Sequence, residues 1–175
     1  MTDSEITHGP RHVALVGDMA VGKSTVGRLL AAEMSRPFLD SDDVIETRTG
    51  RTTGEIAGSD GLTRLHDLEL EVFVEIASSA TPAVIAPAAS VIDHQIGREL
   101  LVTCTTVWLF ASEEALEGRR RAGSHRRPVT DLEAVELRER RHPLMAEVAL
   151  ARIDTTATTP DQTVEQLFQA LGELT

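Results

Sequence analysis

The sequence predicts an α/β protein built on a parallel β-sheet, and three observations support this prediction. Residues 17–25 have the sequence Gly-Asp-Met-Ala-Val-Gly-Lys-Ser-Thr, which matches the phosphate-binding pattern G-x-x-x-x-G-K-S/T. An apolar run precedes this loop and a helical pattern follows it, as the motif requires. Further along the chain, short apolar segments alternate with longer helical ones, which indicates parallel strands joined by right-handed crossovers.

The composition is typical of a single globular domain. The chain has 175 residues, of which 41% are hydrophobic, so it is long enough to bury a substantial core. A formal net charge of −11 argues against nonspecific binding to nucleic acid or to a membrane surface. No apolar run approaches the length of about 18 residues that a membrane span needs. We therefore expect a cytoplasmic monomer with a loose tail over residues 1–10 and one domain over residues 11–175.

Five short, largely apolar segments are expected to form the sheet. Their lack of polar alternation is typical of parallel strands that are covered on both faces. Cys104 is the only cysteine and lies in an apolar run, so it is expected to be a buried, inert thiol. The expected strands are His12–Val16, Phe38–Leu39, Ala83–Ala86, Thr106–Phe110 and Leu150–Asp154.

Helical patterns occupy the segments between these strands. Residues 61–80 carry apolar side chains at helical spacing, and a shorter helix is expected over residues 44–49. Thr130-x-x-Glu133 and Thr159-x-x-Gln162 are capping boxes, each of which predicts the start of a helix. The aromatic side chains expected in the core are Phe73, Trp108 and Phe168.

The phosphate-binding loop, or P-loop, carries the clearest functional signal. Its glycines permit backbone angles that other residues avoid and let the chain approach a ligand closely. Backbone N–H groups at the N-terminus of the next helix then favour a bound phosphate. Lys23 supplies a positive charge for the outer phosphates, and the Ser24 hydroxyl is expected to bind Mg²⁺. The nucleotide site is therefore predicted to include Gly17, Ala20, Gly22, Lys23, Ser24 and Thr25.

Two carboxylates follow the second expected strand. If residues 39–42 are extended, Asp40 and Asp42 point the same way, toward the crevice that strand ends border in open α/β sheets. One carboxylate is then suited to help hold Mg²⁺, and the other to orient an acceptor hydroxyl and take its proton. The alternative is that Ser41, Asp42 and Asp43 only cap the following helix. Spacing alone leaves both interpretations open.

The densest basic cluster lies at residues 119–127, which contain five arginines. Cations on a flexible loop are suited to surround a transferring phosphoryl group while excluding water, so a lid is expected over about residues 120–130. The alternative is a solvated helix end whose charges balance the helix dipole. Further along, Arg141 is expected to point into the crevice, whereas Arg138 and Arg140 are expected to pair with glutamates of their own helix.

Histidines give a weaker signal. His66 and Glu69 are three residues apart and share a helix face, so they either form a structural pair, which we favour, or line a site. The spacing of His94, His125 and His142 does not match that of metal ligands.

These motifs resemble those of the shikimate kinase family over about residues 12–170. The resemblance implies a nucleoside-monophosphate-kinase-like fold, a three-layer α/β/α arrangement with a five-stranded parallel sheet. It also implies an acceptor-binding helical region over about residues 41–80. The implied reaction transfers the γ-phosphate of ATP to the 3-hydroxyl of shikimate with Mg²⁺, so the expected partners are ATP or ADP and a small hydroxy acid. The strongest matches are Gly22–Leu30, Phe38–Asp42, Ile45–Gly50, Arg127–Pro128 and Arg141–Leu144.

The resemblance also implies roles at the nucleotide end of the site. Lys23 and Ser24 would contact phosphates and Mg²⁺, and Asp40 would assist the metal. Arg120 would flank the adenine, and Arg127 would contact phosphate from the lid. Lys23 and Arg127 are thereby implied to be catalytic.

At the acceptor end, the third implied catalytic residue is Asp42, which would hold the acceptor hydroxyls, and Arg141 would bind the shikimate carboxylate. Other positions depart from the family pattern. His66 replaces a second carboxylate-binding arginine, whose bidentate fork histidine lacks. Ala88 and Ala89 stand where the family has glycines, so their Cβ atoms occupy space near the substrate and positive φ becomes costly.

Two functions remain open on this basis. The first is an ATP-dependent kinase whose acceptor is shikimate or a related hydroxy acid. The second is a catalytically impaired nucleotide-binding protein with a regulatory or binding role, which the altered acceptor positions favour. A nucleotide hydrolase is the weakest alternative, because no residue resembles a dedicated water-positioning group.

Overall fold

The computed structural model describes residues 11–122 and 131–173, and its centre is a five-stranded parallel sheet. The strand order is β2-β3-β1-β4-β5. Each strand differs from its predicted bounds by one residue at one end, so the predicted sheet is confirmed. The strands are β1 (Val13–Val16), β2 (Phe38–Asp40), β3 (Val84–Ala86), β4 (Thr105–Phe110) and β5 (Ala151–Asp154).

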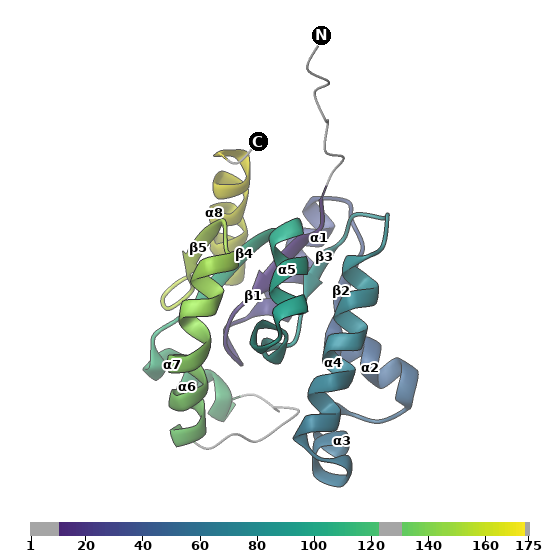
Figure 1. Cartoon of the computed structure of the whole chain (residues 1–175). Coiled ribbons are helices and arrows are strands. Elements are labelled where there is room, and N and C mark those ends of the chain that lie inside the picture. The colour runs from purple at the N-terminus through teal and green to yellow at the C-terminus, as the bar shows by residue number, and fades with distance from the viewer. Residues whose placement is uncertain (1–10, 123–130, 174–175) are drawn as a thin grey trace.

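Helices cover both faces of this sheet (Figure 1). Residues of β1 alternate between two buried apolar clusters, with Val13 and Leu15 in one and Ala14 and Val16 in the other. The three-layer α/β/α arrangement is therefore confirmed. The helices are α1 (Lys23–Glu33), α2 (Ser41–Thr49), α3 (Thr53–Asp60), α4 (Leu62–Ala77), the 3₁₀ helix η1 (Ala89–Asp93), α5 (Gln95–Thr103), α6 (Glu113–Ala122), α7 (Asp131–Val148) and α8 (Pro160–Glu173).

Local signals explain where several helices start. The predicted capping box of α8 is present, because the Gln162 backbone N–H donates to Thr159 Oγ1 at 3.2 Å and the Thr159 N–H donates to the Gln162 side chain at 2.9 Å. A second box, between Thr52 and Glu55, opens α3. The other predicted box involves Thr130, which lies outside the described residues. So do the predicted tail of residues 1–10 and residues 123–130 of the predicted lid.

Two predictions about local structure are wrong. Residues 41 and 42 are not extended, because α2 begins at Ser41 and the Asp40 side chain caps it. Phe168 is 41% exposed instead of belonging to the core, since α8 packs through Val164 and Leu167 and Phe168 lies off that stripe.

Other predictions about the interior are confirmed. Phe73 and Trp108 are buried, and so is Cys104, whose burial raises the pKa of its thiol to about 11. Within residues 11–122 and 131–173, no helix has the length and apolar character to cross a membrane.

Candidate active site

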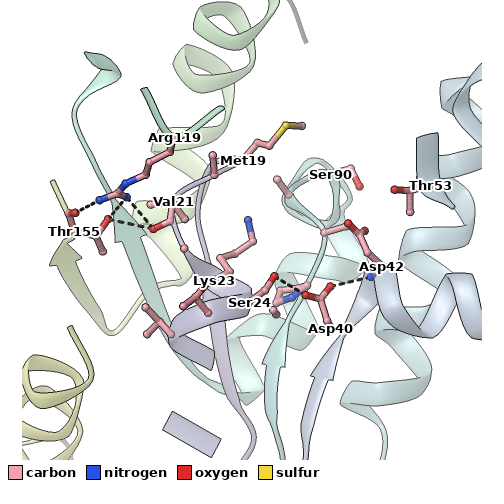
Figure 2. A pocket seen from close by; sticks show the side chains of 18 of the residues that line it. Met19, Val21, Lys23, Ser24, Asp40, Asp42, Thr53, Ser90, Arg119 and Thr155 are labelled. Carbon is pink, nitrogen blue, oxygen red and sulfur yellow. Dashed lines mark hydrogen bonds between the residues drawn. The ribbon is translucent and has the colours of Figure 1, made fainter. Parts of the chain in front are cut away.

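A cavity of about 650 Å³ opens at the carboxyl ends of the strands. Its wall is built from the P-loop, the ends of β2 and β3, and the loop after β5, together with side chains of α3, α4, α6 and α7. This is the edge of a parallel sheet at which ligands bind in open α/β folds. Figure 2 shows the side chains that converge there.

The P-loop wraps one end of this cavity. Gly22 caps α1 with φ of 106°, a conformation that suits glycine. Gly17 does not line the cavity, and its role is to allow close packing, since a Cβ there would lie 2.3 Å from the backbone oxygen of Leu109. Ala20 lines the cavity with φ of 65°, which is unfavourable for a residue with a Cβ. The loop is thus held in a specific, partly strained shape.

Lys23 extends from the start of α1 into the cavity, on the side that faces Asp42 in Figure 2. Its Nζ donates to the carbonyl oxygens of Gly17 at 2.8 Å and Asp18 at 3.1 Å. Burial lowers the pKa of Lys23 below its ordinary value, and the nearby carboxylates of Asp18, Asp42 and Asp40 oppose this effect. The ammonium group therefore lies among backbone dipoles and carboxylates at the mouth of the P-loop.

Asp40 joins the P-loop to the start of α2. Ser24 Oγ donates to Asp40 Oδ2 at 2.6 Å, and the Asp42 backbone N–H donates to Asp40 Oδ1 at 3.0 Å (Figure 2). The cap of α2 is therefore Asp40 itself and not Ser41, Asp42 or Asp43, which lie within the helix, and the same Asp40 side chain accepts a hydrogen bond from the P-loop serine. Asp42 follows in the first turn of α2 and lines the cavity.

Another part of the cavity wall comes mainly from α4 and η1. His66 and Glu69 both line the cavity, so the structure supports the alternative in which this pair lines a site. Glu69 is buried and accepts a hydrogen bond from the hydroxyl of Ser90 on η1. Thr53, at the start of α3, completes this wall. It was missed by sequence analysis, although the Thr52 capping box marks its position.

Ala88 and Ala89 line the cavity, as predicted, but without the expected backbone cost. Ala88 has φ of −58°, and Ala89 begins η1. Among the described non-glycine residues, positive φ occurs at Ala20 and Ser35. The backbone therefore follows a path after β3 that accommodates side chains, and the two Cβ atoms occupy part of the cavity wall.

Arg141 reaches the cavity from α7, as predicted, and is only 7% exposed. The predicted pairing of Arg138 and Arg140 with glutamates of their own helix is wrong. Arg138 pairs with Glu113 of α6, and Arg140 with Asp93 of η1. Both partners are distant in sequence, and Asp93 lies close because η1 packs against α7.

The arginines of α6 differ in their surroundings, because Arg119 faces the cavity and Arg120 is mostly covered by protein away from it. Arg119 lines the cavity and donates to Thr155 Oγ1 at 3.1 Å and to the Val21 carbonyl at 3.3 Å, so it ties the P-loop to the end of β5 (Figure 2). Arg120, which sequence analysis placed at the adenine, does not line the cavity and pairs with Glu113 at 2.6 Å. Arg127 lies outside the described residues.

The structure thus brings most of the predicted site residues to one cavity. Residues that the sequence did not assign to the site come mostly from helices, and two come from the loop after β5. The predicted residues on the wall are Ala20, Gly22, Lys23, Ser24, Thr25, Asp40, Asp42, His66, Ala88, Ala89 and Arg141. The added ones with polar side chains are Thr53, Glu69, Ser90, Arg119, Thr155, Thr158 and Thr163.

Three comparisons with known proteins each match this chain to shikimate kinases. The family model described as shikimate kinase matches residues 19–172. A protein named shikimate kinase from Symbiobacterium thermophilum is 32% identical over 170 residues, with 93% of this chain and 97% of that protein covered. One of the same name from Rhodococcus erythropolis is 36% identical, with 91% and 96% covered. The solved structure of shikimate kinase from Acinetobacter baumannii in complex with shikimate has a TM-score of 0.86 at 31% identity, with 94% of each chain covered.

Proposed function

The chain belongs to the shikimate kinase family, and from this membership we propose that it transfers the γ-phosphate of ATP to the 3-hydroxyl of shikimate. Its family and its fold make it an ATP-dependent phosphotransferase. The observation that carries the choice of acceptor is the single cavity that Lys23 and Ser24 share with Asp42 and Arg141. A phosphate donor held by the first pair would face an acceptor held by the second.

The residues beside the P-loop fit a magnesium ion. Magnesium takes oxygen ligands and is usually held by one or two protein groups together with phosphates and water. Ser24 Oγ and Asp40 Oδ2 are adjacent oxygens at the mouth of the loop, which matches this preference. When bound there, the ion would neutralise charge on the phosphates. Within the described residues no cluster of three or more acidic, histidine or cysteine side chains offers a different metal site.

Asp42 is the residue best placed to act on the acceptor hydroxyl. Its carboxylate lines the cavity across from Lys23 (Figure 2). In the proposed reaction, Asp42 accepts the hydroxyl proton while the hydroxyl oxygen bonds to the γ-phosphorus, and the bond to the bridging oxygen of ADP breaks. Lys23 stabilises the negative charge on the transferring group. Arg127 would add a second cation from the predicted lid.

Arg119 and Arg141 would fix the two substrates at opposite ends of the cavity. Arg119 stands beside Thr155 in the loop after β5, which suits contact with the nucleotide base, and we assign it the role that the sequence suggested for Arg120. Arg141 would face the shikimate carboxylate, the chemistry that its guanidinium favours. Both assignments use side chains whose partners already restrict their orientation.

The proposal is tested by following both products of the reaction. With ATP, Mg²⁺ and shikimate, we expect ADP and a phosphorylated shikimate, detected by a coupled assay and by ³¹P NMR, and both should be lost in a Lys23→Met variant. Release of ADP with inorganic phosphate, at a rate independent of shikimate, would indicate a hydrolase instead. Binding of ATP without either product would indicate the catalytically impaired alternative.

A further inference from the structure

Arg141 is held by a carboxylate of the protein itself. Its Nε and Nη2 donate to Asp93 Oδ2 at 3.0 and 2.7 Å, and Nη2 of Arg140 donates to the same oxygen at 2.9 Å. Asp93 ends η1, whereas both arginines lie on α7. Asp93 does not itself line the cavity, so the contact holds Arg141 from outside the cavity wall. Because Arg141 is almost fully buried, its charge is neutralised at close range with little screening by water.

Asp93 is incompletely satisfied in this position. Its Oδ1 is buried and accepts no hydrogen bond from any residue of the described chain. The contacts of Asp93 with Arg141 and Arg140 are therefore made through one of its two oxygens, Oδ2. Burial raises the pKa of Asp93, but the hydrogen bonds and charges of Arg141 and Arg140 outweigh this effect, and the net pKa lies below the ordinary value. Asp93 is therefore an anion at neutral pH.

The contact between Asp93 and Arg141 matters because the acceptor end of the cavity has more carboxylates than arginines among the described residues. The carboxylate residues Asp42 and Glu69 line the wall there. Among the described residues of α7, Arg141 is the arginine that lines this wall. The other lining cations, Lys23 and Arg119, donate to backbone carbonyls at the nucleotide end. The Nε and Nη2 groups of an arginine can make two parallel hydrogen bonds to one carboxylate, and in Arg141 both donate to Asp93. An acceptor carboxylate must then share Arg141 with Asp93 or displace Asp93 from this edge of the guanidinium.

We propose that Asp93 is a specificity-determining residue, an internal carboxylate that reduces the preference of this site for an acceptor with its own carboxylate. The inference rests on the proposed function, because it concerns the acceptor of the same site. For the ring acid of the proposed function, the site should then distinguish only weakly between the acid and its uncharged analogue. Shikimate and its methyl ester are a matched pair that differs in this charge.

The test measures kcat and KM for shikimate and for methyl shikimate in the full-length protein, its D93N variant and a D60N control. The D93N side chain keeps an oxygen that can accept from Arg141 but removes the competing charge. Asp60 pairs with Arg51 on the exposed face of α3, outside the cavity, so D60N makes the same change in net charge elsewhere. We expect D93N to lower KM for shikimate about tenfold with little change in kcat. The acid-to-ester ratio of kcat/KM should rise by a similar factor, and D60N should change neither.

Asp93 would instead be a positioning residue if folded D93N showed an unchanged or higher KM for shikimate, and the proposal would then be overturned. Should D93N fail to fold, as judged by thermal unfolding, Asp93→Ser is the second variant and is read by the same ratio. If ATP binds but no variant phosphorylates either compound, the proposed function fails. The inference is then decided by calorimetry, where tighter binding of shikimate by D93N supports it, and equal or absent binding in both proteins overturns it.

Discussion

Ser24 and Asp40 are joined by a hydrogen bond of 2.6 Å from Oγ to Oδ2, across 16 positions of sequence. The other oxygen of the same carboxylate accepts the backbone N–H of Asp42 and so caps α2. One buried side chain therefore fixes both the hydroxyl of the P-loop and the orientation of the helix that presents Asp42. Both the stability of the protein and its affinity for Mg²⁺ should therefore depend on Asp40.

Two substitutions at Asp40 are expected to separate these roles. Asp40→Ala removes the cap and should lower the free energy of unfolding by about 0.5–2 kcal/mol. Asp40→Asn keeps an acceptor oxygen for the cap, so its loss should be smaller. Both variants lose the charge beside Ser24 and should need a higher Mg²⁺ concentration for half-maximal activity. Urea unfolding and a Mg²⁺ titration of the initial rate measure the two effects. An unchanged Mg²⁺ requirement in both variants would contradict the role at the metal.

Replacing Ala20 with glycine should stabilise the protein. Its φ of 65° costs an alanine about 1–2 kcal/mol, and the extra freedom of glycine in the unfolded chain offsets about 0.4–1 kcal/mol of the relief. We expect Ala20→Gly to raise the free energy of unfolding by roughly 0.5 kcal/mol. The control is Ala32→Gly on the exposed face of α1, which should lower it by up to about 1 kcal/mol. Equal destabilisation by both substitutions would show that Ala20 is not strained.

Gly17 and Gly118 should respond oppositely to alanine. A Cβ at Gly17 would lie 2.3 Å from the Leu109 carbonyl oxygen, so the P-loop must shift and nucleotide affinity should fall at least about tenfold. Gly118 lies within α6, where a Cβ meets no atom within 4 Å, so Gly118→Ala should stabilise the protein by about 0.5–1 kcal/mol. Calorimetric titration with ADP and thermal unfolding measure the two effects. Normal ADP binding by Gly17→Ala would contradict the close-packing argument.

The Asp93–Arg141 pair should make stability depend on pH in the acidic range. The folded-state pKa of Asp93 is lowered, so its contribution to stability is present above the ordinary value of 3.8 and is lost as pH falls through the lower folded pKa. At pH 7, D93N should therefore be less stable than the parent protein, and this difference should shrink below about pH 4. Urea unfolding at several values between pH 3 and pH 7 measures it. A difference that stays constant down to pH 3 would mean that Asp93 does not titrate with folding.

The sheet and the P-loop could be predicted because both depend on local sequence. Short apolar runs fix the strands of a covered parallel sheet, and the glycine and lysine spacing fixes the loop. Asp40 and Asp42 were placed correctly for a wrong reason, since their common direction comes from a helix start at Ser41 and not from an extended segment.

The partners of side chains on the helices could not be predicted in the same way. Arg119 and Arg120 differ by one position, about 100° around a helix, and only the packing of α6 decides which of them faces the cavity. The Asp93–Arg141 contact spans 48 positions and depends on how η1 meets α7. Side-chain partners of this kind come from tertiary packing, which no local pattern contains.

Asp42 is the position whose replacement should separate chemistry from binding most clearly. Its carboxylate lines the cavity and is the proposed acceptor of the hydroxyl proton, so Asp42→Asn should lower kcat by about 10²–10⁴-fold. KM for ATP should change little, because the P-loop contacts remain. The adjacent Asp43 is a matched control, since it pairs with Arg28 on the surface and Asp43→Asn should leave kcat within about twofold of the parent value. Initial rates at saturating ATP and varied shikimate measure both. If Asp42→Asn kept its kcat, the proton would leave by another route and Asp42 would only orient the acceptor.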